Sequence, residues 1–374
     1  METQQIYLDF NASTPIAPEV AKAMRPFLSQ HFGNPSSHHW AGEPAREAVE
    51  SARRQVADLL QCHPSEIVFT SGGSESNNHA IKGVFYALKE RGNHIITTQI
   101  EHPAVLNPCR FLEKIGAEVS YVGVDQYGRV DPKDIEKAIT SKTILITVMH
   151  ANNEVGTIQP IEEISKISKK NGILLHADAA QSAGKIDTRV NNLGVDLLSV
   201  AGHKVYAPKG IGVLYIREGT PIEPLIHGAG HESGRRAGTE NILLIVGLGK
   251  ACEIAKKYLK GDKIHDLRNR FWELLQKNFG NGVVLNGHPT YRLPNTLNVS
   301  FVGKVGGEIL SQMAGVAAST GAACHSGSVE LSPVLKAMKI SPEVGMGAIR
   351  FSLGRPTTLE ELNRVIQLLK KILP

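Results

Sequence analysis

The sequence predicts an α/β protein with a mostly parallel central sheet, followed by a smaller α+β domain. Short apolar, β-rich runs alternate with stretches in which apolar residues recur every three or four positions, which is the spacing of an amphipathic helix. Strands that alternate with helices favour a parallel sheet covered on both faces. The chain has 374 residues, 41% of them hydrophobic, which is enough for two domains with a large core.

Each expected strand in the first part of the chain ends at a cluster of polar or small residues. The expected strands are Glu66–Thr70, His94–Ile100, Thr143–His150, Gly172–Ala177, Asp196–Val200 and Gly212–Arg217. The helical spacing between them is clearest at Ala45, Val49, Ala52, Val56 and Leu59.

The pattern changes after about Gly261. A helix is expected around Phe271, and short strands are expected at Thr296–Phe301 and Ala348–Leu353. A closing helix is predicted to start with a capping box of Thr357 and Glu360. Near the N-terminus, several prolines prevent one long helix. We expect an arm over residues 1–15 that associates with the small domain, a large domain over 16–260 and a small domain over 261–374.

Composition excludes several classes of protein. No stretch approaches the ~18 apolar residues of a membrane span, and the first residues lack the pattern of a secretory signal. The 4 cysteines show no metal-binding spacing, so we expect no metal site and reduced thiols in a cytoplasmic protein. The net charge of +5 is spread along the chain, which argues against a nucleic-acid surface.

The residues with the greatest chemical potential follow the expected strands, where ligands of open α/β sheets bind. Gly73 and Ser74 begin a helix after the first strand, and a helix N-terminus suits a phosphate. His102, Asp178 and Lys204 follow later strands. A phosphate cradle, a carboxylate, a lysine and a flat imidazole together match pyridoxal phosphate, which needs a lysine for its aldehyde and an acid for its ring nitrogen.

Ten segments, in order along the chain, resemble those of cysteine desulfurases, which are class V, fold-type I pyridoxal-phosphate enzymes. The segments are YLDFNASTP, FGNPSS, FTSGGSESNN, IEHPAV, HANNEVGTIQP, HADAAQSAGK, AGHKVYAPKG, RRAGTEN, STGAACHSG and IRFSLGR. The resemblance covers essentially the whole chain.

The resemblance implies a homodimer whose large domain binds the cofactor. Lys204 would hold pyridoxal phosphate covalently, Asp178 would pair with the ring nitrogen, and His102 would stack on the ring. Gln181 would bond the ring oxygen, and Asn153 would contact the cofactor or the substrate. The phosphate would be held by Gly73, Ser74, His203 and, from the second subunit, Thr239.

The resemblance also implies the reaction. Arg350 would bind the substrate carboxylate, with Arg355 as a second choice. Lys204 would remove the α-proton, and Cys324 in the small domain would take sulfur from L-cysteine as a persulfide and leave L-alanine. A protein would then accept the sulfur for iron–sulfur clusters or another sulfur-transfer pathway.

Two departures from the family pattern leave alternatives open. Ala201 replaces a serine that often contacts the phosphate, and GAACHSG is similar to segments of selenocysteine lyases and of desulfurases for DNA phosphorothioation. The substrate is therefore L-cysteine or L-selenocysteine. A class V aminotransferase would not need Cys324, and a non-catalytic scaffold would not need Lys204 and Asp178 together.

Overall fold

The protein is described from a computed structural model that covers residues 5–259, 261–320, 322–325 and 328–373, with side chains described for all of these except 322–325, 328 and 329. Its larger sheet has seven strands in the order β2-β8-β7-β6-β5-β3-β4. Only β8 runs antiparallel to its neighbours, so the prediction of a mostly parallel sheet is confirmed. The strands are β2 (Ile67–Thr70), β3 (His94–Thr98), β4 (Glu118–Val122), β5 (Thr143–Met149), β6 (Leu174–Asp178), β7 (Leu197–Ala201) and β8 (Gly212–Ile216).

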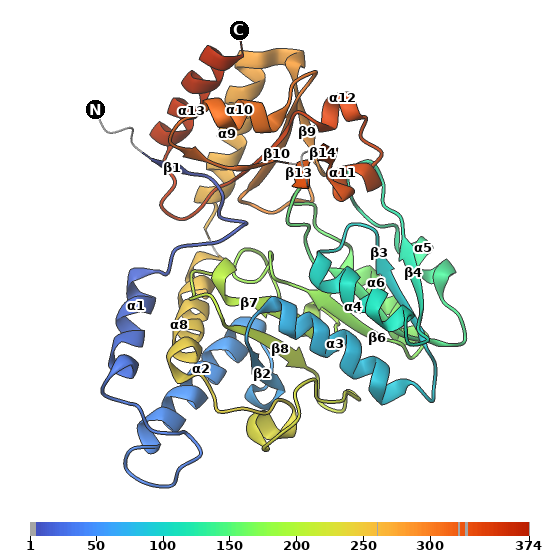
Figure 1. Cartoon of the computed structure of the whole chain (residues 1–374), viewed down its shortest axis with the longest axis vertical. Coiled ribbons are helices and arrows are strands. Elements are labelled where there is room, and N and C mark those ends of the chain that lie inside the picture. The colour runs from blue at the N-terminus through green and yellow to red at the C-terminus, as the bar shows by residue number, and fades with distance from the viewer. Residues whose placement is uncertain (1–4, 260, 321, 326–327, 374) are drawn as a thin grey trace.

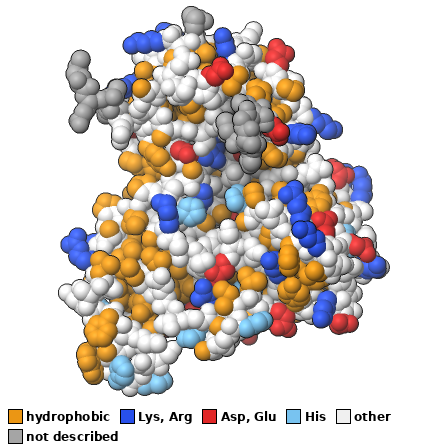
Figure 2. Space-filling view, in the orientation of Figure 1, with side chains coloured by type: hydrophobic (Ala, Val, Ile, Leu, Met, Phe, Trp, Pro, Cys, Tyr) orange, Lys and Arg blue, Asp and Glu red, His pale blue; other side chains and the backbone are white. Residues whose placement is uncertain are grey.

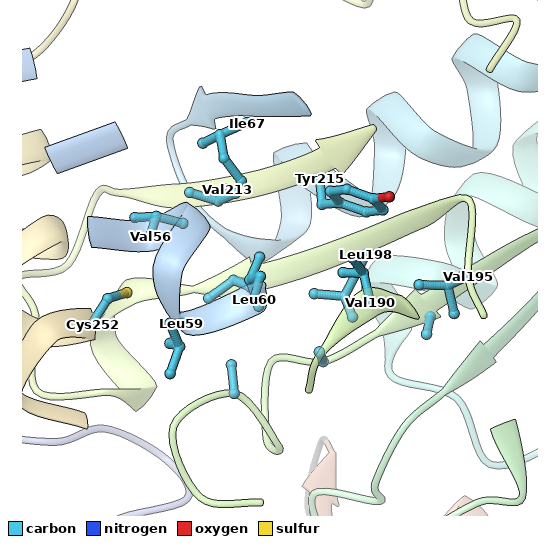
Figure 3. Close-up of a cluster of buried hydrophobic side chains, with 14 of the residues drawn as sticks. Val56, Leu59, Leu60, Ile67, Val190, Val195, Leu198, Val213, Tyr215 and Cys252 are labelled. Carbon is cyan, nitrogen blue, oxygen red and sulfur yellow. The ribbon is translucent and has the colours of Figure 1, made fainter. Parts of the chain in front are cut away.

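Helices cover both faces of this sheet (Figure 1). One face packs against α2, α5, α6 and α8, and the opposite face packs against α3 and α4. Figure 3 shows side chains of α2 and α8 meeting those of β2, β7 and β8 in the first of these layers. The helices of this part are α1 (Pro18–Met24), α2 (Glu43–Leu60), α3 (Gly73–Leu88), α4 (Pro103–Glu113), α5 (Pro132–Ala138), α6 (Ile161–Lys170), α7 (Val190–Leu193) and α8 (Ile242–Tyr258).

A second sheet of four strands, in the order β12-β15-β10-β9, lies in the upper body of Figure 1. Its strands are β9 (Val283–Asn286), β10 (Thr296–Phe301), β12 (Ser319–Thr320) and β15 (Ala348–Ser352), and they pair antiparallel. Phe271, Val299 and Leu369 belong to the buried cluster beside it. The helices of this part are α9 (Lys263–Phe279), α10 (Gly306–Gln312), α11 (Pro333–Ala337), α12 (Pro342–Gly345) and α13 (Leu359–Ile372).

The beginning of the chain lies against its far end. Strand β1 (Ile6–Tyr7) pairs in parallel with β11 (Val316–Ala317), and Ile6 and Leu8 are buried in the apolar cluster of the second sheet. In Figure 1 this segment reaches the upper body before the chain descends to α1. The short segment between β1 and α1 therefore connects the two sheets.

The capping box predicted for the closing helix was wrong by one position. Thr358 caps α13, accepting from the backbone N–H of Glu361, whose side chain accepts from the N–H of Thr358. Thr357 is buried, and its hydroxyl instead accepts from the N–H of Gly354 at 2.9 Å. The adjacent pairs Thr357–Glu360 and Thr358–Glu361 have the same capping-box spacing, so the sequence does not distinguish them. Because Thr357 is buried, Thr358 is the residue that caps the helix.

Among the described residues, no helix combines the length and apolar character needed to cross a membrane.

Candidate active site

A cavity of about 630 Å³ lies at the carboxyl ends of β2, β5, β6 and β7, where it faces the second sheet. This size is typical of sites for small ligands and cofactors. Most of the residues that the sequence singled out line it. They are Gly73, Ser74, His102, Asn153, Asp178, Gln181, His203, Lys204 and Arg350.

Asp178 is the last residue of β6, and its carboxylate is buried. Its Oδ2 accepts from Asn77 Nδ2 at 2.7 Å, and its Oδ1 accepts from the backbone N–H of Ala180 at 2.8 Å. Both protein partners are neutral, so the carboxylate can still stabilise a cation in the cavity. Asn77 was not predicted as a site residue, although it lies one turn after Gly73 on α3.

Lys204 follows β7 at the end of a short 3₁₀ turn, Gly202–Lys204. Because β6 and β7 are adjacent and parallel, this turn lies next to the end that carries Asp178. The Lys204 amine donates to the carbonyl oxygens of Asn11 at 2.5 Å and Ala12 at 2.8 Å. Burial, together with the positive charge of Arg350, lowers the pKa of Lys204 to about 8. The amine can therefore lose its proton readily, as a nucleophile or base must.

Gln181 is held from two sides. Its Nε2 donates to the Asn11 carbonyl at 2.9 Å, and its Oε1 accepts from Lys185 Nζ at 2.9 Å. The Lys185 amine also donates to Asn11 Oδ1 at 3.2 Å, and burial lowers its pKa to about 7. These contacts fix the orientation of the Gln181 amide. Asn11 and Lys185 are inside two quoted motifs, but a sequence pattern does not show which distant side chains meet.

The N-terminus of α3 opens on the same cavity through Gly72, Gly73 and Ser74. Gly72 has φ +151°, and a Cβ there would meet no atom within 4 Å, so the backbone faces open space. At Gly73 a Cβ would lie 3.2 Å from the Cβ of Ala201, which explains why both residues are small. Exposed backbone N–H groups at a helix N-terminus suit a phosphate. Ala201 has a methyl group where the family pattern often has a serine, so it cannot supply a hydroxyl to the phosphate.

His102 caps α4 at the end of β3. Its Nδ1 accepts from the backbone N–H of Ala104 at 3.1 Å, so in the neutral ring the proton is on Nε2. Burial lowers the pKa of His102, and Asp178 opposes this effect. Burial together with Lys204 also lowers the pKa of His203, to about 4. Both imidazoles are thus neutral near pH 7.

Next to His102 in the chain, the carboxyl group of Glu101 is buried. It accepts from Thr98 Oγ1 at 2.7 Å and from the backbone N–H of Met149 at 2.9 Å. Burial raises the pKa of Glu101 to about 8. These hydrogen bonds connect the ends of β3 and β5 through Glu101. In the sequence, only its position next to His102 indicated that Glu101 could lie near the site.

Arg350 extends from β15 of the second sheet into the cavity. Its guanidinium donates to Asp9 Oδ1 at 2.7 Å, to Ser319 Oγ at 2.9 Å and to the Asn153 carbonyl at 2.9 Å. The planar fork of an arginine matches the two oxygens of a carboxylate, and Arg350 lines the cavity, so it can bind the carboxylate of a ligand there. Asp9 and Ser319 complete a network that spacing alone did not predict.

Arg355 does not line the Lys204–Asp178 cavity. Its guanidinium lies between the rings of Tyr206 and Tyr258, 4.1 and 4.2 Å from their centroids, and borders a smaller neighbouring cavity. Arg355 was the second choice for binding the substrate carboxylate, and the structure does not bring it into the lining of the cavity that contains Arg350. Two aromatic rings hold this cation in stacking contacts, and stacking partners distant in sequence are not visible in the motif.

Thr239 does not line the cavity that contains Lys204 and Asp178. Thr239 lines an adjacent cavity of about 230 Å³ that shares Ser71 and Gly210 with the main one. Cys324 is on β13 (Ala322–His325), which forms a hairpin with β14 (Ser328–Leu331), and its side chain lies outside the described part of the chain.

The donor set fits pyridoxal phosphate. A readily deprotonated amine and a carboxylate with neutral partners share one cavity, as this cofactor's aldehyde and ring nitrogen require. The helix N-terminus at Gly73 offers a cradle for the phosphate.

Comparison with known proteins agrees with this site. Residues 6–365 match the family model for aminotransferase class-V. The cysteine desulfurase IscS of Dictyoglomus turgidum is 50% identical, covering 99% of this chain and 95% of that relative. The cysteine desulfurase IscS of Methanosarcina thermophila is 47% identical, covering 99% of this chain and 92% of that relative.

Solved structures give the same result. A "NifS-like protein" superimposes with a TM-score of 0.93 at 39% identity, covering 99% of both chains. A structure described as "SspA in complex with cysteine" has a TM-score of 0.84 at 40% identity, covering 93% of this chain and 98% of that one. The chain therefore belongs to the aminotransferase class-V family and, within it, to the cysteine desulfurases, which are pyridoxal-phosphate enzymes.

Proposed function

We propose that the protein is a pyridoxal-phosphate-dependent cysteine desulfurase that converts L-cysteine to L-alanine and receives the sulfur on Cys324. The observation that carries this proposal is the shared cavity of Lys204, Asp178 and Arg350, in a chain 50% identical to a named cysteine desulfurase. The cavity offers a base, a partner for a ring cation and a clamp for an amino-acid carboxylate. We propose the division into residues 1–15, 16–260 and 261–374 as its domain organisation.

The residues of the large sheet would hold the cofactor. Lys204 would bind its aldehyde, Asp178 its ring nitrogen and Gln181 its ring oxygen, while His102 covers one face of the ring. Gly73, Ser74 and His203 would bind the phosphate. When bound, pyridoxal phosphate withdraws electron density from the α-carbon and the β-carbon of the substrate.

The residues around the cavity divide the proton transfers. Arg350 and Asn153 orient the substrate, with the α-hydrogen toward Lys204. The pKa of Lys204, lowered to about 8, lets its amine accept that proton near neutral pH. His102 holds a proton on Nε2, because Nδ1 is used by Ala104, and can deliver it to the reacting carbons.

Cys324 then acts as the nucleophile. Its thiolate attacks the substrate sulfur, so that an S–S bond forms while the bond from the β-carbon to sulfur breaks. The electron pair of the broken bond stays with the β-carbon, which takes up a proton. The balance is L-cysteine plus enzyme thiol giving L-alanine plus enzyme persulfide, with no external oxidant.

The test is product analysis with two substrates. The purified holoenzyme is expected to release alanine from L-cysteine and to place one sulfur atom on Cys324, as seen by mass spectrometry with and without an acceptor protein. Alanine release from L-selenocysteine alone would instead identify a selenocysteine lyase. Transamination without alanine release would identify an aminotransferase.

Asn77 gives a prediction about cofactor binding. In Asn77→Ala, the amide that donates to Asp178 Oδ2 at 2.7 Å is lost. This buried carboxylate oxygen then has no hydrogen bond from Asn77. We expect the affinity for pyridoxal phosphate to fall by about ten- to a hundredfold, the usual effect of losing a hydrogen bond to a charged group. Titration of the cofactor-free protein measures this. The neighbouring Asn78, which is half-buried and does not line the cavity, provides the control Asn78→Ala, and an equal loss in both variants would contradict the role of Asn77.

We also propose a homodimer in which Thr239 completes the phosphate site of the partner subunit. Two observations support it. Thr239 lines the adjacent cavity rather than that of its own Lys204. Large apolar side chains are exposed around the loop after α1, where hydrophobic and histidine atoms gather at the lower left of Figure 2: Leu28 is 70%, Phe32 74% and Trp40 80% exposed.

Mixing two inactive variants tests the shared site. If Thr239 serves the partner, a dimer of one Lys204→Ala chain and one Thr239→Ala chain contains one intact site. Random reassociation should then restore about a quarter of wild-type activity, because half of the dimers are mixed. If Thr239 served its own chain, every site would carry a defect and mixing would restore nothing.

The remaining partners follow from the chemistry. A persulfide on Cys324 needs a thiol-bearing acceptor, and a protein acceptor for iron–sulfur cluster or other sulfur-transfer synthesis is part of this proposal, with no role for direct nucleic-acid binding. A cytoplasmic location is also proposed, in keeping with the free thiols of Cys62, Cys109 and Cys252.

A further inference from the structure

The hairpin β13–β14, which carries Cys324, is flanked on both sides by serines whose hydroxyls form hydrogen bonds with other elements of the fold. Before it, Ser319 on β12 donates to Asp9 Oδ1 and accepts from Arg350, both at 2.9 Å. That contact belongs to the substrate-binding network already described. After it, Ser332 comes directly after the last residue of β14 and contacts Glu154, which has no place in the proposed mechanism.

The direction of the Ser332–Glu154 hydrogen bond follows from the surroundings. Ser332 caps α11, and its oxygen accepts from the backbone N–H groups of Val334 at 3.1 Å and Leu335 at 3.5 Å. The hydroxyl hydrogen is therefore free to point at Glu154 Oε2, 2.6 Å away. Glu154 is the acceptor, and a carboxylate accepts more strongly than a neutral acid.

Glu154 is itself held rigidly. The side chain of Asn152 accepts from the backbone N–H groups of Glu154 and Val155, both at 2.9 Å, and donates to the Ile100 carbonyl at 3.1 Å. Asn298 donates to the Glu154 carbonyl at 3.1 Å. The turn is thus tied to the end of β3 and to β10, and it places Asn153 in the cavity.

An apolar contact supports the same junction. Val334 and Leu335 of α11 pack in a cluster with Ile100, Met149 and Val155. Within the described residues, Glu154 does not line the cavity, and its Oε1 is buried with no hydrogen-bond partner. Glu154 therefore does not contact a ligand of the cavity. Its buried carboxylate binds the serine at the end of the hairpin, which indicates a structural role in holding that hairpin.

We propose that Glu154 is a positioning residue for sulfur transfer: its carboxylate holds Ser332 and thereby fixes the hairpin that carries Cys324 relative to the cavity. This role rests on the proposed function, in which Cys324 receives sulfur. It acts after substrate binding, so its loss affects the transfer step and leaves cofactor and substrate binding intact.

The ionisation of Glu154 gives the role a pH dependence. Burial raises the pKa of Glu154 to about 7, and Ser332 and Arg350 oppose that rise. Arg350 on β15 is the cation that faces it, and Asp9 of the N-terminal segment lies on the other edge of Arg350. Above this pKa the carboxylate holds Ser332, whereas protonation below it weakens the bond. The contribution of Glu154 to transfer is therefore lost as the pH falls through about 7.

The variants Glu154→Ala, Glu154→Gln and Ser332→Ala separate the possible roles, with exposed Glu162→Ala as the control. In single turnover, persulfide formation on Cys324 should slow about tenfold in Glu154→Ala and Ser332→Ala, while KM for cysteine and the visible spectrum of the cofactor stay at wild-type values. Glu154→Gln keeps an acceptor oxygen. It should transfer sulfur at a rate close to wild type at pH 8 and lose the part of the pH profile centred near 7.

A second measurement does not need the loaded enzyme. In the cofactor-free protein, the alkylation rate of Cys324 by iodoacetamide, followed by peptide mass spectrometry, should change about tenfold in Glu154→Ala and Ser332→Ala but not in Glu162→Ala. Thermal unfolding of Ser332→Ala and Glu154→Gln checks that both fold.

Wild-type rates of persulfide formation and alkylation in Ser332→Ala and Glu154→Ala would overturn the role of Glu154 while leaving the proposed function intact. Equal losses of cofactor binding and transfer would also overturn it, because they indicate a purely structural effect. Absence of sulfur on Cys324 in the wild-type enzyme would instead refute the proposed function, and this role with it.

Discussion

Replacing Lys204 by alanine is expected to lower the rate of alanine formation from L-cysteine by at least about a thousandfold, because the variant loses both the amine that binds the cofactor and the base that takes the α-proton. The fold should survive, since the amine donates to two backbone carbonyls at the cavity wall and, among the described residues, packs in no apolar core. Alanine quantification under saturating cofactor and cysteine measures the effect.

A matched control uses the other lysine at the same cavity wall. Lys209 lines the cavity but is exposed. Lys209→Ala is expected to retain activity within about tenfold of wild type, because an exposed charge is screened by solvent. A Lys204→Ala enzyme that kept near-normal alanine formation would show that another group is the base, and the assignment of roles around Asp178 would fail.

Replacing Cys324 by serine should also abolish alanine formation from L-cysteine, by about a thousandfold or more, because a serine hydroxyl is not ionised near neutral pH and attacks sulfur poorly. Cofactor content and the spectral change on adding cysteine should remain, since Lys204, Asp178 and Arg350 are untouched. This separation of binding from transfer distinguishes a desulfurase from an aminotransferase, in which the serine variant would keep its activity.

Cys62 is the control for the thiol. It is half-buried, and burial raises its pKa to about 12, so it carries almost no thiolate at neutral pH. Cys62→Ser should leave alanine formation unchanged. Persulfide found on Cys62, with Cys324 unmodified, would contradict the assignment of the nucleophile.

The sequence was sufficient to predict the large sheet because its central strands are buried on both faces and therefore form continuous apolar runs. Strand β5, predicted as Thr143–His150 and observed as Thr143–Met149, is an example. Strand β4 was missed because it lies at the sheet edge and its residues are half-exposed, so Glu118 and Ser120 interrupt the run. The reversed direction of β8 was not predicted, because an apolar run carries no information about strand direction.

The site was predictable where its residues follow a strand end. Asp178 and Lys204 end neighbouring parallel strands, so their proximity follows from the sheet. Their partners come from other elements: Asn77 from the helix after β2, and Asn11 from the segment before α1. Which amide meets which carboxylate is decided by tertiary packing, and no local pattern encodes it. The placement of Arg355 between two tyrosines has the same explanation.

The central claim is that pyridoxal phosphate joins the Lys204 amine in the cavity of Asp178. Borohydride reduction of the yellow holoenzyme, followed by peptide mapping, tests it directly. We expect the colour to bleach and one cofactor per chain to be found attached to Lys204. A cofactor fixed on Lys185 or Lys209, or a protein that binds none, would contradict it.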